Sequence, residues 1–306
     1  MYQLLSGKKV NNYLSYIILM NNIQMEKQIS YCIKTNIVTI KNHNMSVFVG
    51  GQGKETIVLM AGSAQVSPIL EFKPLINELQ KSFRVVVIEK FGYGLSDIVK
   101  EKRTTDIILD DSRNALAKLE IKGPLILCPY SLSGLEALLW AQEYPNEVKA
   151  IIGIDMAFPY HYKNMNAKGR SFVLSIFRFF VNLGITYLIP DSIINKLVPY
   201  DLFSKEEKKL YRQLAKRNLV NYDIINEGEV IDENLKLFKD NTKPVPSLLL
   251  SSTGKSTGFK TDVWRYPHMQ YVDDNPKSKS VCYDCGHELP FVKYKEISKE
   301  IIEFIK

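Results

Sequence analysis

The chain has 306 residues, of which 45% are hydrophobic and 24% are charged, a composition typical of ordinary globular proteins. Its formal net charge is +7, but the basic residues are scattered and no nucleic-acid motif accompanies them. This pattern excludes nucleic acid as a partner. Weak contact with an anionic membrane surface is a minor alternative. The four cysteines do not make a disulfide framework, and the CxxC at Cys282 and Cys285 lacks the partners of a zinc site, so we expect a reducing, cytoplasmic location and no metal.

Residues 1–28 resemble an extension that precedes the folded core. Lys8 and Lys9 are followed by an apolar run at 13–20, which is too short to span a bilayer and has no small-residue cleavage site. We therefore expect residues 1–28 to be poorly ordered, and neither a signal peptide nor a membrane span.

From residue 29 onward, apolar strand patterns alternate with helical patterns, which favours an α/β fold with a parallel sheet. Residues 56–60 form a continuous apolar run, typical of a strand covered on both faces. Ser67 is a good N-cap, and Pro68 suits the first position of a helix. The predicted strands are 29–40, 45–49, 56–60, 83–88, 125–128, 150–154, 245–250 and 280–283. The predicted helices with one apolar face are 68–79, 105–119, 135–144 and the closing helix 297–305.

Residues 159–243 interrupt this alternation because they contain no clear strand pattern. An aromatic helical stretch spans residues 172–187, and a charged helix follows at 204–217. Such an insertion between two parallel strands predicts a lid over the carboxyl edge of the sheet. We expect the aromatic side chains to pack inside the lid and against the sheet. A hydrophobic acyl pocket, or contact with a membrane, is the alternative.

The segment 125–138 joins a buried strand to a helix through a very tight turn. Its apolar run ends at Pro129, helical periodicity begins just after Gly134, and the hydroxyl of Ser131 lies between them. A turn of this kind lifts one side chain above the sheet and points the N-terminus of the next helix at the atom under attack. We therefore predict that Ser131 is a nucleophile.

Four motifs together resemble those of the α/β-hydrolase fold family. They are Gly62-Ser63, the segment 91–97 (FGYGLSD), the turn 130–134 (YSLSG) and the segment 284–287 (DCGH). The resemblance covers nearly everything from Ile29 to Lys306. It implies a mostly parallel sheet flanked by helices, with a core at 29–158 and 244–306 and an inserted all-helical cap at 159–243.

The resemblance also implies a base at His287, which follows the last predicted strand and a glycine. Ser131 needs such a base because a free serine hydroxyl is a poor nucleophile at neutral pH. The other three histidines fit this role less well. His43 in an early turn and His268 in a polar loop are expected at the surface, whereas His161 at the entrance of the lid could line the pocket.

The acid that should orient the imidazole is displaced from its commonest place in the family. Residues 251–255, which follow the strand at 245–250, contain no carboxylate, and the next one is Asp262. Asp155 ends the strand after the helix that follows the nucleophile, a position that some members of the fold use instead. It also preserves the order serine, acid, histidine. We favour Asp155 as the acid and keep Asp262 as the alternative.

The backbone N–H groups of Ser63 and Leu132 match the family's donors to the oxyanion. The usual histidine before the glycine of the first loop is replaced by Ala61, and Pro129 and Ser133 occupy positions where glycines are usual. A serine is still small enough for close approach of helix and strand, and a proline lacks an N–H that would need a partner.

The sequence thus predicts a serine hydrolase, esterase-like or lipase-like, that acts on a small-molecule ester or acyl substrate without a cofactor. An aspartate nucleophile is excluded at position 131, Cys128 is expected to be buried in its strand, and residues 252–256 lack the upstream glycine of a phosphate-binding loop. Two rival hypotheses are an acyltransferase with the same triad and a non-catalytic ligand-binding protein on a hydrolase scaffold.

Overall fold

The computed structural model describes residues 33–163, 165, 167–196, 203–239, 245–273 and 275–306. The extension predicted for residues 1–28 lies outside the described residues. Within the described part of the chain, no helix has both the length and the apolar composition needed to cross a bilayer.

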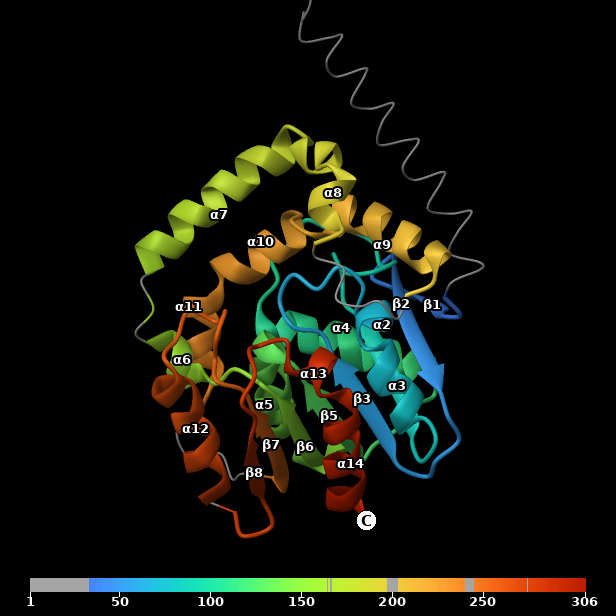
Figure 1. Ribbon diagram of the computed structural model, residues 1–306, viewed down its shortest axis with the longest axis vertical. Coiled ribbons are helices and arrows are strands. Elements are labelled where there is room, and N and C mark those ends of the chain that lie inside the picture. Colours follow the sequence, from blue (N-terminus) through green and yellow to red (C-terminus); the bar gives the residue numbers. More distant parts are fainter. Residues whose placement is uncertain (1–32, 164, 166, 197–202, 240–244, 274) are drawn as a thin grey trace, which may run out of the picture.

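One eight-stranded sheet forms the centre of the fold, in the order β1-β2-β4-β3-β5-β6-β7-β8 (Figure 1). The pairs β1–β2 and β2–β4 are antiparallel, and every later pair is parallel. The α/β-hydrolase fold expected from the motifs is therefore confirmed. The strands are β1 (Asn36–Ile40), β2 (His43–Gly50), β3 (Thr56–Met60), β4 (Arg84–Glu89), β5 (Leu125–Pro129), β6 (Val148–Ile154), β7 (Ser247–Ser251) and β8 (Lys279–Cys282).

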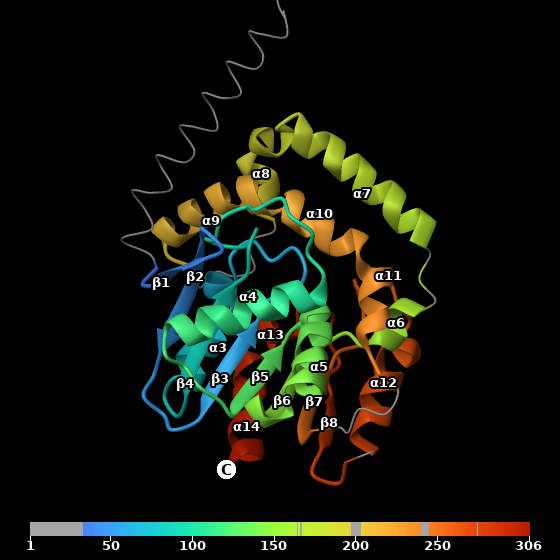
Figure 2. The same cartoon turned by 180° about the vertical axis from the view of Figure 1, so that it is seen from behind.

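Helices bury both faces of this sheet, which is why its central strands are apolar on both sides. The helices α2 (Pro68–Glu71), α3 (Lys73–Leu79) and α14 (Tyr294–Ile305) cover one face. The helices α4 (Thr105–Lys118) and α5 (Gly134–Glu143) cover the other face, which is nearer the viewer in Figure 2. The single helix predicted for 68–79 is divided, because Pro74 lacks the N–H that a continuous helix would require.

Between β6 and β7 the described residues form helices and no strand. Figure 1 shows α7 to α10 gathered at one end of the sheet, with α6 and α11 beside them. The charged helix predicted at 204–217 is α9, which begins with a reciprocal cap: Glu207 N donates to Ser204 Oγ at 3.1 Å, and Ser204 N donates to Glu207 Oε2 at 2.9 Å. The helices are α6 (Pro159–Lys163), α7 (Ala167–Asn182), α8 (Asp191–Ile194), α9 (Lys205–Asn218), α10 (Tyr222–Glu229) and α11 (Ile231–Asn234).

Two expectations about which side chains are buried are wrong. The aromatic side chains of α7 do not form a packed core, because no residue of that helix is buried. His268 is not at the surface: it lies fully buried in α12 (Thr261–Asp273), a helix that the sequence did not suggest. The buried residues of α12 are Trp264, Pro267 and His268. None of them is aliphatic, so the helix lacks the stripe of aliphatic residues by which helices are usually predicted.

Candidate active site

Ser131 sits in a strained turn directly after β5. Its φ angle is +55°, in the left-handed region that residues with a Cβ rarely adopt, at a typical cost of about 1–3 kcal/mol. The turn is held by a hydrogen bond from Ala157 N to Ser131 O at 2.7 Å. A short 3₁₀ segment then leads into α5, so that the hydroxyl stands at the N-terminal end of that helix, as the sequence predicted.

Ser133 and Gly134 explain how this turn tolerates its unusual sequence. The Ser133 hydroxyl is fully buried, accepts from Tyr130 N at 3.0 Å, and lies 3.0 Å from the carbonyl oxygen of Met60 in β3. Gly134 lets α5 approach the end of β6, since a Cβ there would lie 2.2 Å from Ala157 O. The serine in a glycine position thus ties the turn to the neighbouring strand.

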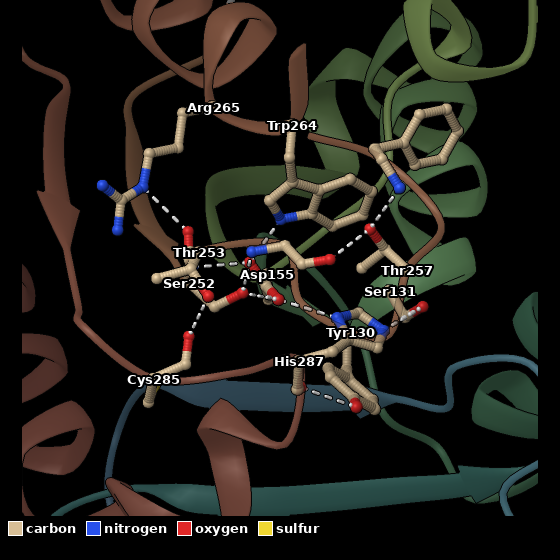
Figure 3. A network of polar contacts seen from close by, with 12 residues as sticks. Tyr130, Ser131, Asp155, Ser252, Thr253, Thr257, Trp264, Arg265, Cys285 and His287 are labelled. Atoms are coloured by element: carbon tan, nitrogen blue, oxygen red, sulfur yellow. Dashed lines mark hydrogen bonds and ion pairs between the residues drawn. The ribbon is translucent and has the colours of Figure 1, made fainter. Parts of the chain in front are cut away.

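Ser131, His287 and Asp155 form one hydrogen-bonded line across the carboxyl ends of the strands (Figure 3). His287 Nε2 lies 2.8 Å from Ser131 Oγ, and His287 Nδ1 lies 2.7 Å from Asp155 Oδ2. An ionised carboxylate only accepts hydrogen bonds, so the proton of the neutral imidazole belongs on Nδ1. Nε2 then presents its lone pair to the serine hydroxyl. This is the arrangement that a serine nucleophile and its base require.

The Asp155 carboxylate is fully buried and accepts hydrogen bonds from three residues. Besides His287, these are Ser252, whose N and Oγ lie 2.7 and 2.6 Å away, and Trp264, whose Nε1 lies 2.7 Å from Oδ1. Burial raises the pKa of Asp155, but the hydrogen bonds from His287 and Ser252 outweigh it and hold that pKa below its ordinary value. The carboxylate is therefore ionised at neutral pH.

Aromatic rings hold the imidazole of His287 in this orientation. Tyr130 stacks on it, with ring centroids 5.0 Å apart, and donates its hydroxyl to His287 O at 2.9 Å. Trp264 meets the same ring edge-on at 5.6 Å. Sequence reasoning missed Ser252, Trp264 and Tyr130. The available signals were the tyrosine beside the nucleophile and a serine directly after the strand where an acid was expected.

The loop after β3 lies against Ser131. A Cβ on Gly62 would lie 2.9 Å from Tyr130 Cδ1 and 3.0 Å from the Cβ of Ser131, so a larger residue would push these side chains away. No loop, turn or side-chain acceptor in the described residues takes a hydrogen bond from the N–H of Ser63 or of Leu132. Both predicted oxyanion donors are thus free to bind an oxygen atom.

A buried polar network supports this loop, in which Ala61 stands where the family usually has a histidine. Gly62 N donates to Gln65 Oε1 at 2.7 Å, and Gln65 Nε2 donates to Glu71 Oε2 at 3.0 Å. The other Glu71 oxygen accepts from Val66 N at 2.8 Å. Burial raises the pKa of Glu71 to about 7, with these hydrogen bonds opposing the rise. The network holds the loop from both ends.

A second buried network connects the helical segment to the core. Lys90 Nζ donates to Glu136 Oε1 of α5 at 2.6 Å and to Glu227 Oε1 of α10 at 2.5 Å. Burial lowers the pKa of Lys90, but the two carboxylates outweigh it and raise that pKa. Tyr93 donates to Glu227 Oε2 and accepts from Ala64 N in the loop after β3. Lys90 therefore joins α10 to α5, and Tyr93 connects the same glutamate of α10 to the loop after β3.

The remaining candidates lie outside this line of residues. Asp262 is exposed at the start of α12 and makes no hydrogen bond with His287 in the described residues. His161 is buried against Trp264 and accepts from Phe158 N at 2.9 Å. Burial lowers its pKa to about 4. Cys128 is buried in β5, as predicted. Among the described residues, no three His, Cys, Asp or Glu side chains gather as a metal site would require.

The chain belongs to the alpha/beta hydrolase fold family, whose model matches residues 55–293. A curated relative is the uncharacterized protein YbdG of Bacillus subtilis (strain 168), which is 32% identical over 215 residues, covering 70% of this chain. The match covers 66% of that relative, so the chain spans about two thirds of its length.

Solved structures with low sequence identity share the fold. A putative lipase from Acinetobacter baumannii is 15% identical, with a TM-score of 0.68 over 93% of this chain and 95% of that one. An epoxide hydrolase from Bacillus megaterium is 18% identical, with a TM-score of 0.69 over 88% of this chain and 99% of that one. At such identities the likeness shows the fold and leaves the reaction to be argued from the site.

Proposed function

We propose that this protein is a serine hydrolase that cleaves a carboxylic ester through an acyl-enzyme on Ser131. The observation that carries the proposal is the unbroken line from Ser131 Oγ through the His287 ring to the ionised Asp155, with distances of 2.8 and 2.7 Å. Serine at position 131 also argues against the aspartate-based chemistry of the family's epoxide hydrolases.

In the first step, Ser131 Oγ attacks the ester carbonyl carbon while His287 Nε2 takes its proton. The carbonyl oxygen becomes an oxyanion, which the N–H groups of Ser63 and Leu132 bind. The C–O bond to the alcohol then breaks, and His287 gives the proton to the leaving oxygen. Asp155 stabilises the charged imidazole throughout and does not itself change protonation.

In the second step, water enters and His287 Nε2 accepts one of its protons. The resulting hydroxide attacks the acyl carbon, the bond to Ser131 Oγ breaks, and His287 Nε2 gives its proton to Ser131 Oγ, which regenerates the free enzyme. The products are a carboxylic acid and an alcohol. No cofactor enters this balance. We further propose that residues 159–243 act as a cap and that its side chains select a partly apolar acyl group.

The test is covalent labelling by a fluorophosphonate probe combined with hydrolysis of p-nitrophenyl esters of increasing acyl length. We expect the probe to label Ser131 in the folded protein and Ser131→Ala to lose both labelling and turnover. Ser82→Ala is the matched control, because it removes an exposed hydroxyl outside the line of Ser131, His287 and Asp155, and both signals should persist. A folded protein that is not labelled at Ser131 would refute the hydrolase proposal.

A further inference from the structure

Helix α7 presents its polar side to the protein and its apolar side to the solvent. Arg170, Leu174 and Arg178, spaced by four residues, point toward α10 and α11. Arg170 Nη2 lies 2.6 Å from Asp232 Oδ2, and Arg178 Nη2 lies 2.7 Å from Glu229 Oε2. Leu174 packs between the two arginines against Gly228, where an added Cβ would lie 3.1 Å from Leu174 Cδ1. Ion pairs rather than a packed core therefore hold this helix.

The opposite side of α7 carries a continuous set of exposed apolar residues, which we call the outer face. Phe172 and Phe179 are 69% and 59% exposed, far more than large aromatic side chains usually are. At 100° per residue the outer face is centred directly opposite the two arginines. It consists of Phe172, Val173, Ile176, Phe179, Phe180 and Leu183.

No element among the described residues covers the outer face. Leu188 and Ile193, on either side of Pro190, add two more exposed apolar side chains at the end of the segment. Figures 1 and 2 show α7 as the outermost described helix, with α10 between it and the rest of the fold. A surface of this kind, far from the sheet, marks a site of contact with a lipid or a protein.

The charges around the outer face select an anionic partner. The exposed residues Lys163 and Lys168 precede the outer face in the sequence and Lys196 follows it, and none of the three forms an ion pair with any described carboxylate. The described residues between 159 and 196 include one acidic residue, Asp191, which is itself paired with Lys216 at 2.8 Å. An apolar helix face with basic flanks is the pattern of helices that lie in the plane of an anionic membrane.

We propose that the outer face of α7 docks this protein on an anionic lipid bilayer. The phenylalanines enter the boundary between headgroups and acyl chains, and the flanking lysines contact the headgroup charges. A second copy of the chain fits the charges less well, because a symmetric pair through this face would bring two sets of unpaired lysines together.

The test is cosedimentation of the full-length protein with vesicles of phosphatidylcholine, with and without about 30% phosphatidylglycerol. We expect binding to the anionic vesicles that weakens in high salt and is lower without phosphatidylglycerol. The variant Phe172→Ser/Phe179→Ser should weaken it by about tenfold or more. Ile37→Ser/Met269→Ser removes two apolar side chains that are each 54% exposed elsewhere, and should bind like the wild type.

Binding is measured without substrate, so the result does not depend on ester hydrolysis. The proposal is overturned if the wild-type protein does not sediment with anionic vesicles. It is also overturned if Phe172→Ser/Phe179→Ser binds as strongly as the wild type, since another part of the chain would then make the contact. Light scattering supplies a third check: a dimer that this variant dissociates would assign the face to a second copy.

Discussion

Replacing Asp155 by asparagine tests the proposed triad at its least conventional member. In the native site, Asp155 Oδ2 accepts from His287 Nδ1 and from Ser252 Oγ, while Oδ1 accepts from Ser252 N and Trp264 Nε1. An asparagine keeps its oxygen on the two N–H donors and turns its amide toward His287. That amide donates to Nδ1, so the imidazole proton moves to Nε2. Nε2 then faces Ser131 as a donor and cannot accept its proton.

The expected loss follows from the charge and the tautomer together. At an effective dielectric constant of ~20, a carboxylate and an imidazolium with charge centres about 4 Å apart attract by ~4 kcal/mol, which corresponds to about 1,000-fold in rate. The wrong tautomer adds to this loss, so we expect kcat of Asp155→Asn to fall by about 1,000- to 10,000-fold. KM should change little, because Asp155 is fully buried behind His287 and does not face the substrate.

The assay is steady-state hydrolysis of a short p-nitrophenyl ester, with thermal unfolding to show that the variant is folded. Asp262→Asn is the matched control: it removes the exposed alternative acid and should stay within about twofold of the wild type. The assignment of Asp155 is refuted if Asp155→Asn keeps a tenth or more of the activity, or if Asp262→Asn suffers the large loss instead.

Three further predictions concern residues around this line. Trp264→Phe removes the indole donor to Asp155 and should lower kcat about tenfold with KM nearly unchanged; unaltered ester hydrolysis would contradict a positioning role. Ser133→Ala removes the hydroxyl that bonds Tyr130 N and Met60 O, while Tyr130 N keeps its 3.2 Å bond to Met60 O; it should lower the free energy of unfolding by about 0.5–1.5 kcal/mol in urea titrations, and an unchanged value would contradict this. Burial lowers the pKa of His161 and His268 to about 4, so the unfolded chain binds more protons between pH 4 and 6.5 and stability falls as pH falls through that window. His268→Phe should reduce the slope of unfolding free energy against pH by up to ~1.4 kcal/mol per pH unit, and an identical slope would count against this effect.

Local patterns were enough to predict most of the sheet and the tight turn that carries Ser131. The predicted strand 56–60 agrees with β3 to the residue, because a β-branched threonine followed by four consecutive apolar residues is typical of a strand buried on both faces. The turn around Ser131 is equally local, since strand, turn and helix lie within one short segment. His287 could be proposed because the carboxyl ends of parallel strands meet at one edge.

The surroundings of the triad could not be predicted in the same way, because they depend on segments far apart in the chain. Trp264 donates to Asp155 from α12, a helix that follows β7. This helix has no aliphatic stripe from which it could have been predicted. The orientation of α7 could not be predicted from the sequence either. Periodicity shows that a helix has an apolar side, but only the partners of Arg170 and Arg178 show that this side faces outward.

The proposed acid, Asp155, lies one strand away from the place where the family commonly has its carboxylate. After β7, where the family commonly has its carboxylate, this chain has Ser252. Its amide and hydroxyl instead hold the carboxylate of Asp155 at the end of β6. Asp155 has a φ angle of +45° and its N–H bonds to Leu250 O at 2.6 Å, so β7 also stabilises the unusual backbone of the acid. A bare carboxylate at the end of β6 would be buried without enough donors, and burial would raise its pKa. Ser252 and Trp264 supply the missing donors, which explains how the Asp155 carboxylate stays ionised in a fully buried position.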